Sequence, residues 1–206
     1  MVNSDPGDLY EADGYTSFTT SSGQMVGLQV RVVFDNGISE TVSWSTNGIN
    51  QSDWSVTQGP GSTFSNPFVV RNLQSSFAIT TLEFHGGGTT TLFDRGVFPS
   101  TSGTANGRDF IELSNIRQNQ DIEVTYFDEI RTAGSSAVGD IFAGMRINFS
   151  SGLTQADGAL RFVSDTDTSI NLIRLVTRRN PEPGAAVFFC AACSVLVSRR
   201  KRRLSE

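Results

Sequence analysis

Asp165 and Asp167, separated by one threonine, are the residues of this sequence best suited to hold a metal ion. In an extended chain, side chains two residues apart project from the same face, so the two carboxylates lie side by side. Such oxygens suit Ca²⁺, which binds roughly six to eight of them. Asp94 and Asp109 would add ligands if their loops converge on this segment. The segment lacks the glycine and the distal glutamate of an EF-hand loop, so a turn rich in Asp and Thr, with no cofactor, is the favoured interpretation and a Ca²⁺ site is the alternative.

Groups for acid–base catalysis are scarce in the chain. Its one histidine, His85, precedes three glycines, an arrangement similar to the oxyanion loop of lipases and esterases. That loop works with a Gly-x-Ser-x-Gly nucleophile elbow, which the sequence lacks, so we interpret His85 as a strand-end histidine in a glycine turn. The paired carboxylates of a glycoside hydrolase are the remaining option, with four candidates on expected strands: Glu40, Glu83, Glu112 and Glu123. Because the sequence brings no two of them together, we predict a protein that is not an enzyme.

Two tryptophans offer flat apolar faces of the kind that stack on sugar rings. Trp44 shares its strand parity with Val42 and is expected in the core. Trp54 follows the polar pair Ser52-Asp53 and is therefore the candidate for an exposed ligand-binding position, although the core is the favoured interpretation for both rings.

Strands must position these residues, because apolar and polar residues alternate along the body of the chain, over about residues 23–177. Every second residue from Val26 to Phe34 is apolar, which predicts one buried face. Asp35-Asn36-Gly37 follows, and Asn-Gly favours a type I′ turn, so Phe34 and Ile38 are expected to flank a tight hairpin. The apolar phase then shifts near Thr80-Thr81, which predicts a β-bulge there.

Further short strands are expected after turn-rich stretches, and no segment of the body shows a helical apolar stripe. This pattern predicts an all-β domain, an antiparallel β-sandwich with jelly-roll-like topology over residues 23–177. Residues 1–22 are predicted to be an N-terminal lead-in segment. The further strands are expected at residues 68–73, 77–84, 89–94, 109–113, 122–127, 141–149, 159–163 and 170–176.

The charges are distributed unevenly along the chain. Residues 1–180 carry 19 acidic and 11 basic residues, while five of the 16 basic residues follow one another directly near the C-terminus. An acidic body argues against binding nucleic acid, which requires a basic footprint. Both cysteines, Cys190 and Cys193, lie in an apolar stretch, so we interpret them as small apolar residues rather than a redox or metal pair.

The composition changes abruptly in residues 178–206. Pro181, Glu182 and Pro183 lead into an uncharged stretch of 16 residues, 183–198. As a helix it would be about 24 Å long, against a hydrocarbon core of roughly 30 Å, so a short transmembrane helix is expected. The positive-inside rule then predicts a cytoplasmic C-terminus, with the body on the far side of the membrane. The basic residues that follow this stretch are Arg199, Arg200, Lys201, Arg202 and Arg203.

A Pro-Glu-Pro tripeptide, a short apolar span and a terminal basic cluster, in this order, resemble the PEP-CTERM sorting signal, also catalogued as an ice-binding protein C-terminal domain. The resemblance covers about residues 180–203. It implies that an exosortase, a membrane enzyme of Gram-negative bacteria that make extracellular polysaccharide, recognises Pro181–Pro183 and cleaves nearby. Asn180 stands where the family more often has an apolar residue. Members of the family carry an N-terminal signal peptide, so we expect an export signal upstream of Met1.

These observations lead to one expected function and one alternative. The chain is expected to be an exported, non-enzymatic surface or extracellular-matrix protein, held in the inner membrane as a precursor and located in the cell envelope or outside the cell after processing. The alternative is a carbohydrate-binding module for exopolysaccharide, assisted by calcium. A hydrolase using two carboxylates is the third and least favoured hypothesis.

Overall fold

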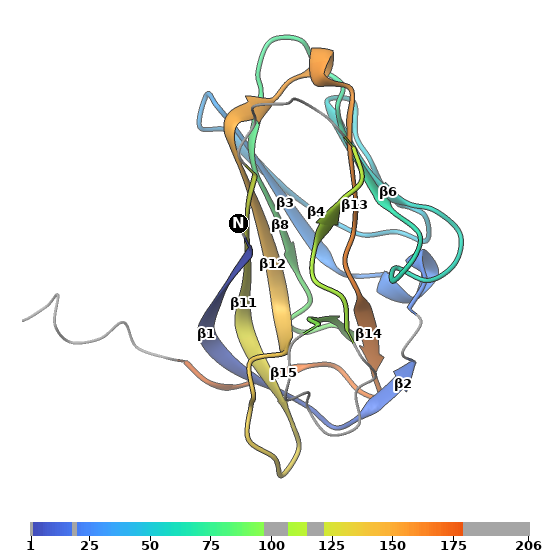
Figure 1. The fold of residues 1–206 in the computed structure, drawn as a ribbon, viewed down its shortest axis with the longest axis vertical. Helices are drawn as coiled ribbons and strands as arrows, with labels where there is room; N and C mark the ends of the chain where they lie inside the picture. Colours follow the sequence, from blue (N-terminus) through green and yellow to red (C-terminus); the bar gives the residue numbers. More distant parts are fainter. Residues whose placement is uncertain (1, 18–19, 97–106, 115–121, 179–206) are drawn as a thin grey trace, which may run out of the picture.

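The computed structural model describes residues 2–17, 20–96, 107–114 and 122–178, which form an all-β structure of two facing sheets (Figure 1). All paired strands are antiparallel except β1 and β11, which are parallel. The larger sheet has the order β15 (Arg174–Thr177), β1 (Val2–Ala12), β11 (Ile122–Thr132), β12 (Ile141–Leu153), β8 (Ile79–His85), β3 (Gln29–Phe34) and β4 (Ser39–Ser43). The smaller sheet has the order β10 (Ile111–Glu112), β13 (Ala159–Val163), β7 (Phe68–Asn72), β6 (Trp54–Gln58) and β5 (Gly48–Asn50). Two short 3₁₀ helices, η1 (Ser22–Met25) and η2 (Gln155–Asp157), lie outside the sheets.

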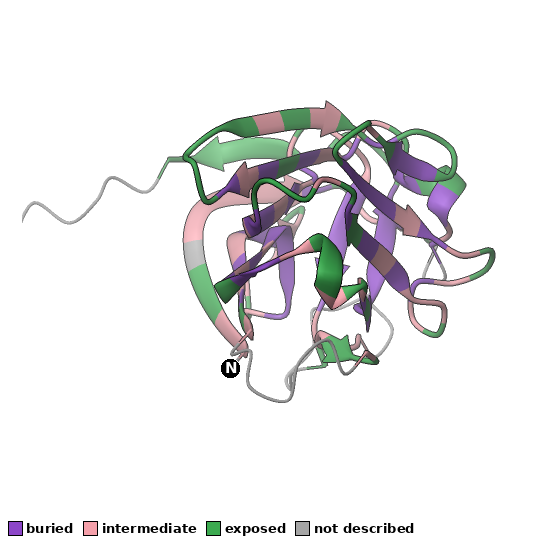
Figure 2. Ribbon diagram, turned by 90° about the horizontal axis from the view of Figure 1, so that it is seen from above, coloured by how far each residue is buried: buried purple, intermediate pink, exposed green. Residues whose placement is uncertain are grey.

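The main core lies between the two sheets. Figure 2 shows buried residues, in purple, interrupted by intermediate and exposed residues along the strands. Along β3 and β7, for example, every second residue is buried, as the two-residue period of a strand requires. Phe68 of the smaller sheet stacks on Phe162, with ring centroids 5.0 Å apart, and packs edge-on against Phe84 of the larger sheet. Apolar contacts between the sheets therefore hold the sandwich-like arrangement together.

The expected hairpin is present between β3 and β4, but its turn differs from the prediction. Phe34 and Ile38 flank the turn, because the Phe34 N–H donates to the Ile38 carbonyl oxygen at 2.9 Å. Gly37 has a φ of +81°, whereas Asn36 is not among the described residues with positive φ. A type I′ turn needs positive φ at both central residues, so the loop is the three-residue kind that ends in a left-handed glycine. The bulge predicted near Thr80-Thr81 is confirmed, since the pairing of β8 with β3 skips Thr80.

The predicted boundary at residue 22 is wrong. Strand β1 lies between β11 and β15 in the larger sheet, so residues 2–12 belong to the sheet rather than to a lead-in segment. Its polar sequence hides this role, because most of its described side chains are only partly buried and it shows no alternation of buried and exposed residues. Val26 also departs from the expected buried face: it is 55% exposed, because β3 begins only at Gln29.

A branch of short strands extends the larger sheet beyond the end of β8. After His85 the chain turns through three glycines and returns as β9 (Thr91–Asp94), which pairs with the start of β12. Strand β14 (Thr166–Ser169) pairs with the other edge of β9, and β2 (Tyr15–Ser17) pairs with β14. This branch carries Asp94 and Asp167, and Asp165 directly precedes β14.

The C-terminal segment with residues 181–183 and 199–203 lies outside the described residues, as do both cysteines. Among the described residues, none forms a helix with the length and apolar character required to span a membrane.

Candidate metal centre

Cross-strand pairing brings three aspartates onto one face of the β9–β14 ladder. The register pairs Asp167 with Leu92 and Thr166 with Phe93, which places Asp165 opposite Asp94 one step further along. Asp165 and Asp167 share a face because they are two residues apart, and Asp94 meets both across the strands. Carboxylate oxygens of Asp94, Asp165 and Asp167 all lie within 4.8 Å of one another, and no other such group of three occurs among the described residues.

The three side chains are fully enclosed, with residue exposures of 1% for Asp94, 2% for Asp165 and 0% for Asp167. Within the part of the chain that the structure describes, no hydrogen-bond donor reaches either carboxylate oxygen of Asp94 or of Asp167, or Oδ1 of Asp165. Buried polar groups are almost always hydrogen-bonded, and a buried charge needs a compensating partner. The site therefore requires either protons or a cation.

Burial and mutual repulsion change the acidity of all three groups. Burial, together with the charges of Asp167, Asp165 and Asp140, raises the pKa of Asp94 from 3.8 to about 9. Burial and the neighbouring charge of Asp167 raise the pKa of Asp165 to about 7. Burial raises the pKa of Asp167 to about 7 as well. Three carboxylates this close together repel one another and cannot all be ionised in the absence of a positive charge. A bound cation would balance their charges and allow each group to release its proton.

Backbone hydrogen bonds fix the positions of the three aspartates. The Asp94 N–H donates to the Asp165 carbonyl oxygen at 3.1 Å. The Asp165 N–H donates to the carbonyl of Arg108 at 3.0 Å, and the Arg108 N–H donates back to the Asp94 carbonyl at 3.1 Å. Buried threonines anchor β14 from its other face, where the Thr63 and Thr166 hydroxyl oxygens lie 2.9 Å apart. The carboxylates therefore converge from a rigid frame, which is what a metal site requires.

Gly107 leaves the space that the Asp94 carboxylate occupies. A Cβ atom at residue 107 would overlap Asp94 Oδ1 and would lie 2.6 Å from the carbonyl oxygen of Arg95. Any larger residue at this position would push against the cluster. The glycine thus belongs to the site although it offers no ligand.

Asp109, the second residue considered from the sequence, does not join the cluster. Its carboxylate accepts two hydrogen bonds from Arg95, at 2.8 Å from Nε and 3.2 Å from Nη2. The side chain of the neighbouring residue Arg108 is also engaged elsewhere: its guanidinium donates to the Phe64 carbonyl oxygen at 2.5 Å and lies over the Phe64 ring. Sequence reasoning could not distinguish Asp94 from Asp109 as a ligand, and only strand pairing separates their roles.

Asp140 is a buried neighbour that sequence reasoning missed. It directly precedes β12, at the point where Ile141 pairs with Asp94, and it is 0% exposed. Its charge contributes to the raised pKa values of Asp94 and Tyr15. The sequence feature that could have identified it is its position beside a strongly apolar strand, since Asp140 directly precedes β12 just as Asp94 ends β9.

The chemistry of the donor set points to a hard cation. All the candidate ligands are oxygens, with no histidine or cysteine beside them among the described residues. Zinc and copper prefer nitrogen and sulfur, whereas calcium takes carboxylates in flexible geometry and magnesium requires a near-ideal octahedron. The residues present therefore fit Ca²⁺ best, with Asp94, Asp165 and Asp167 as the ligands that the protein would supply.

The other residues singled out from the sequence have structural partners. Trp54 is 0% exposed and its indole N–H donates to Glu40 Oε2 at 2.7 Å, so it is not the exposed sugar-stacking ring considered for it. Trp44 is also in the core, as expected, and donates to the Ser22 carbonyl oxygen at 3.0 Å. The favoured interpretation of both tryptophans as core residues is confirmed.

His85 ends β8 as predicted, and its Nε2 lies 3.2 Å from Asp128 Oδ2. The glutamates considered for catalysis each have their own partners rather than facing one another. Glu83 accepts hydrogen bonds from two arginines, Glu123 accepts one from Asn3, and Glu112 lies 3.4 Å from the Ser114 hydroxyl.

Comparisons with known proteins give no match: no family model, no curated protein and no solved structure is significantly similar to this chain.

Proposed function

We propose that this chain is an exported, non-enzymatic protein of the cell surface or extracellular matrix, with a jelly-roll-like β-sandwich whose β9–β14 end is completed by Ca²⁺. The observation that carries the proposal is the buried group of Asp94, Asp165 and Asp167, whose carboxylates face one another without donors among the described residues. A cation would remove the cost of burying these charges and would join β9 to β14.

The expected cellular location supports calcium over other ions. Extracellular modules bind Ca²⁺ with dissociation constants of roughly 10⁻⁴ to 10⁻³ M, a range matched to the surroundings of an exported protein. In the cytoplasm, where free calcium is far lower, the same cluster would keep its protons. The protein would therefore reach its full stability only after export.

The C-terminal segment supports the sorting part of the proposal. Its similarity to PEP-CTERM signals implies an exosortase as partner, with the inner membrane holding the precursor through the apolar residues 183–198. Fusing residues 175–206 to an exported reporter should give exosortase-dependent trimming. Unchanged processing and location after Glu182→Ala and Pro183→Ala would reject this part, independently of the metal.

The calcium part is tested by thermal unfolding of the full-length chain in a mild zwitterionic detergent at pH 7.5. At a free Ca²⁺ concentration 100 times the dissociation constant, binding to the folded state adds about 2.7 kcal/mol. For a domain of this size the melting temperature should rise by roughly 5–10 °C relative to EDTA. Mg²⁺ at the same concentration should have a smaller effect.

Two variants make this test specific. Asp167→Asn removes one charge from the cluster, so it should stabilise the protein in EDTA at pH 7.5 while abolishing the response to calcium. Asp53→Asn changes an exposed aspartate and should leave both quantities as in the wild type. The proposal fails if calcium leaves the melting temperature unchanged, or if Asp167→Asn responds to calcium as the wild type does.

A further inference from the structure

We propose that a groove on the outer face of the larger sheet binds a neutral polysaccharide, with Phe127 as the ring against which a sugar packs. The groove has a volume of about 250 Å³, slightly below the range of roughly 300–1,000 Å³ for typical ligand pockets, which suits a short stretch of a chain. Its walls come from four strands, β3, β4, β8 and β11. The lining residues are Gln29, Arg31, Thr41, Glu83, His85 and Phe127.

Strand register shows that the groove runs across the strands. One row crosses the sheet from Ser43 through Gln29, His85 and Gly144 to Phe127, each residue opposite the next. The neighbouring row runs from Thr41 through Arg31, Glu83 and Arg146 to Thr125, two residues away on every strand. Both rows face away from the core, so a linear ligand could lie along them.

Gly144 makes room for the aromatic ring. A Cβ atom at this position would overlap the Cζ and Cε atoms of Phe127, so the outer end of the ring lies over the glycine backbone. His85 lies beside Phe127, with ring centroids 5.9 Å apart and ring planes 27° apart, and the Arg146 guanidinium lies 5.2 Å from the Phe127 centroid. The ring is therefore fixed in place across the sheet, close to the surface.

The backbone of β11 is shaped to present this ring. Asp128 has a φ of +60°, the one positive value among the described residues that are not glycine. The inward–outward alternation of β11 shifts at this point, so Phe127 and Asp128 both contact His85 on the outer face. The bulge of β1 accommodates the change, and the Asp8 N–H donates to Asp128 Oδ1 at 2.9 Å. An unusual backbone conformation held by its surroundings is a common mark of a binding site.

Charge selects the class of ligand. Glu83 accepts a hydrogen bond from Arg146 at 2.6 Å and another from Arg31 at 3.0 Å, and His85 is bonded to Asp128. Positive and negative side chains therefore balance along the groove, which offers no excess cation to attract a phosphate or an acidic sugar. Sugar hydroxyls both donate and accept, so they can use these prearranged groups and the Gln29 amide, while the ring packs against the apolar face of a pyranose.

The groove is independent of the metal centre. It shares no residue or strand with Asp94, Asp165 and Asp167, which lie on β9 and β14 or directly before β14. Loss of the calcium response together with intact glycan binding would overturn the proposed function alone, whereas the reverse result would overturn this inference alone.

The test is isothermal titration of the full-length chain in saturating Ca²⁺ with soluble neutral polysaccharides, namely dextran, galactomannan, xyloglucan and hydroxyethylcellulose, and with acidic alginate. The zwitterionic detergent avoids sugar headgroups that would compete. We expect at least one neutral polysaccharide to bind more tightly than alginate. Phe127→Ala should weaken that binding about tenfold or more, and Phe127→Tyr, which keeps the ring, should retain it.

Phe77→Ala, at an exposed phenylalanine outside the groove, is the matched control and should bind as the wild type does. Unchanged circular dichroism and melting temperature of Phe127→Ala would confirm that the loss is not one of folding, and Thr41→Trp, which fills the groove from its edge, provides a second test. The inference is overturned if no neutral polysaccharide binds, if alginate binds most tightly, or if Phe127→Ala and Thr41→Trp both bind as well as the wild type.

Discussion

Acidic side chains are treated in opposite ways in two regions of the larger sheet. On the outer face, Glu83 lies between Arg31 and Arg146 on the neighbouring strands, and their hydrogen bonds hold its pKa below the usual value despite its burial. On the β9–β14 branch, the cross-strand neighbour of Asp94 is another acid, Asp165, and burial together with like charges raises the pKa values. Cross-strand pairing thus decides whether a buried carboxylate has a basic partner or must keep a proton or bind a cation.

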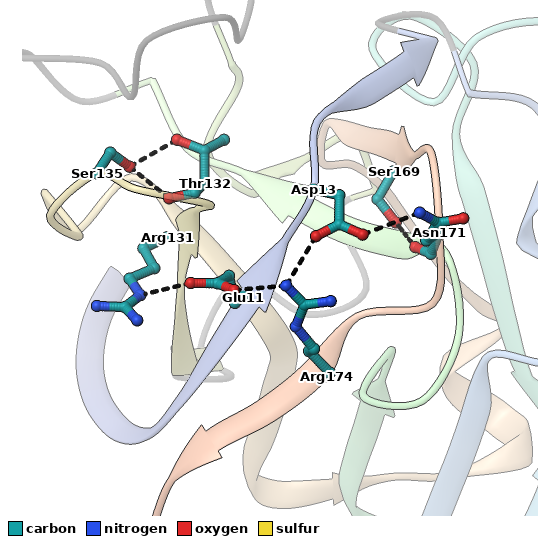
Figure 3. A network of polar contacts seen from close by, with 8 residues as sticks. All are labelled: Glu11, Asp13, Arg131, Thr132, Ser135, Ser169, Asn171 and Arg174. Carbon is teal, nitrogen blue, oxygen red and sulfur yellow. Dashed lines mark hydrogen bonds and ion pairs between the residues drawn. The ribbon is translucent and has the colours of Figure 1, made fainter.

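At the edge of the larger sheet, as on its outer face, an acidic side chain is paired with two arginines. Figure 3 shows Glu11 between Arg131 and Arg174, with Arg174 also reaching Asp13. The Glu11 carboxylate lies 3.0 Å from Arg131 Nε and 2.7 Å from Arg174 Nη2, and Arg174 Nη2 lies 2.9 Å from Asp13 Oδ1. Hydrogen bonds from Arg174, the largest cause, lower the pKa of Glu11. Every acid of this network has a basic or amide partner, which contrasts with the three buried aspartates of the candidate metal centre.

The largest expected effect is the loss of stability of the metal-free protein as the pH rises. In the unfolded chain the aspartates lose their protons near pH 3.8, but in the folded protein Asp165 and Asp167 keep them to about pH 7 and Asp94 to about pH 9. Rising pH therefore favours unfolding across this window. The shift of Asp167 alone, from 3.8 to about 7, corresponds to about 4 kcal/mol.

Urea unfolding in EDTA between pH 5 and pH 9 measures this effect, and saturating calcium should flatten the profile. From about pH 6 upward the lowered pKa values of Glu83 and Glu11 add almost no further pH dependence, because both groups are then nearly fully ionised in the folded and in the unfolded state. The other charged or titratable groups near the cluster are Asp140, Tyr15 and Arg108. A metal-free protein that grows more stable from pH 5 to pH 8 would contradict the assignment.

Gly107→Ala should have the next largest effect, because the new methyl group would overlap the Asp94 carboxylate. Overpacking of this kind costs about 1–3 kcal/mol, and the calcium affinity should fall as well. Denaturant unfolding with and without calcium measures both. Gly59→Ala is the matched control, since a Cβ atom there meets nothing within 4 Å, and equal behaviour of the two variants would refute the close fit at residue 107.

Glu83→Gln tests the opposite region. It removes an acid that two arginines contact, and we expect a loss of about 1–2 kcal/mol at pH 7. Because its pKa is lowered in the folded state, the wild-type advantage should disappear as the pH falls below the unfolded value of 4.5. Glu123→Gln, which touches only one amide partner, serves as control. A variant more stable than the wild type at pH 7 would remove the contrast between the two regions.

Arg174→Ala should have the smallest effect, because this side chain is 58% exposed and water screens its ion pairs. The melting temperature should fall by less than in Glu83→Gln, and the difference should vanish in high salt. A decrease that persists at 1 M salt would mean that the edge network contributes through packing instead of charge.

Much of the fold could be predicted from local patterns. The β3–β4 hairpin and the bulge at Thr80 were visible because apolar periodicity and an Asn-Gly turn act over a few neighbouring residues. Strand β1 was missed because its parallel pairing with β11 joins residues more than 100 positions apart. The segment around Asp165 and Asp167 was interpreted mainly as a turn, yet it leads into the buried strand β14. The threonines of β14 can be buried because their hydroxyl groups form hydrogen bonds with Thr63 and Thr20, which are distant in sequence.

The all-β character, the acidity of the body and the shared face of Asp165 and Asp167 could be read from the amino-acid sequence, because each follows from composition or from the two-residue period of a strand. Three outcomes required the folded arrangement: that Asp94, and not Asp109, completes the cluster, that Trp54 is buried, and that Phe127 lies over Gly144. These outcomes depend on register between strands distant in sequence, and a shift of one residue would turn each side chain to the other face of the sheet.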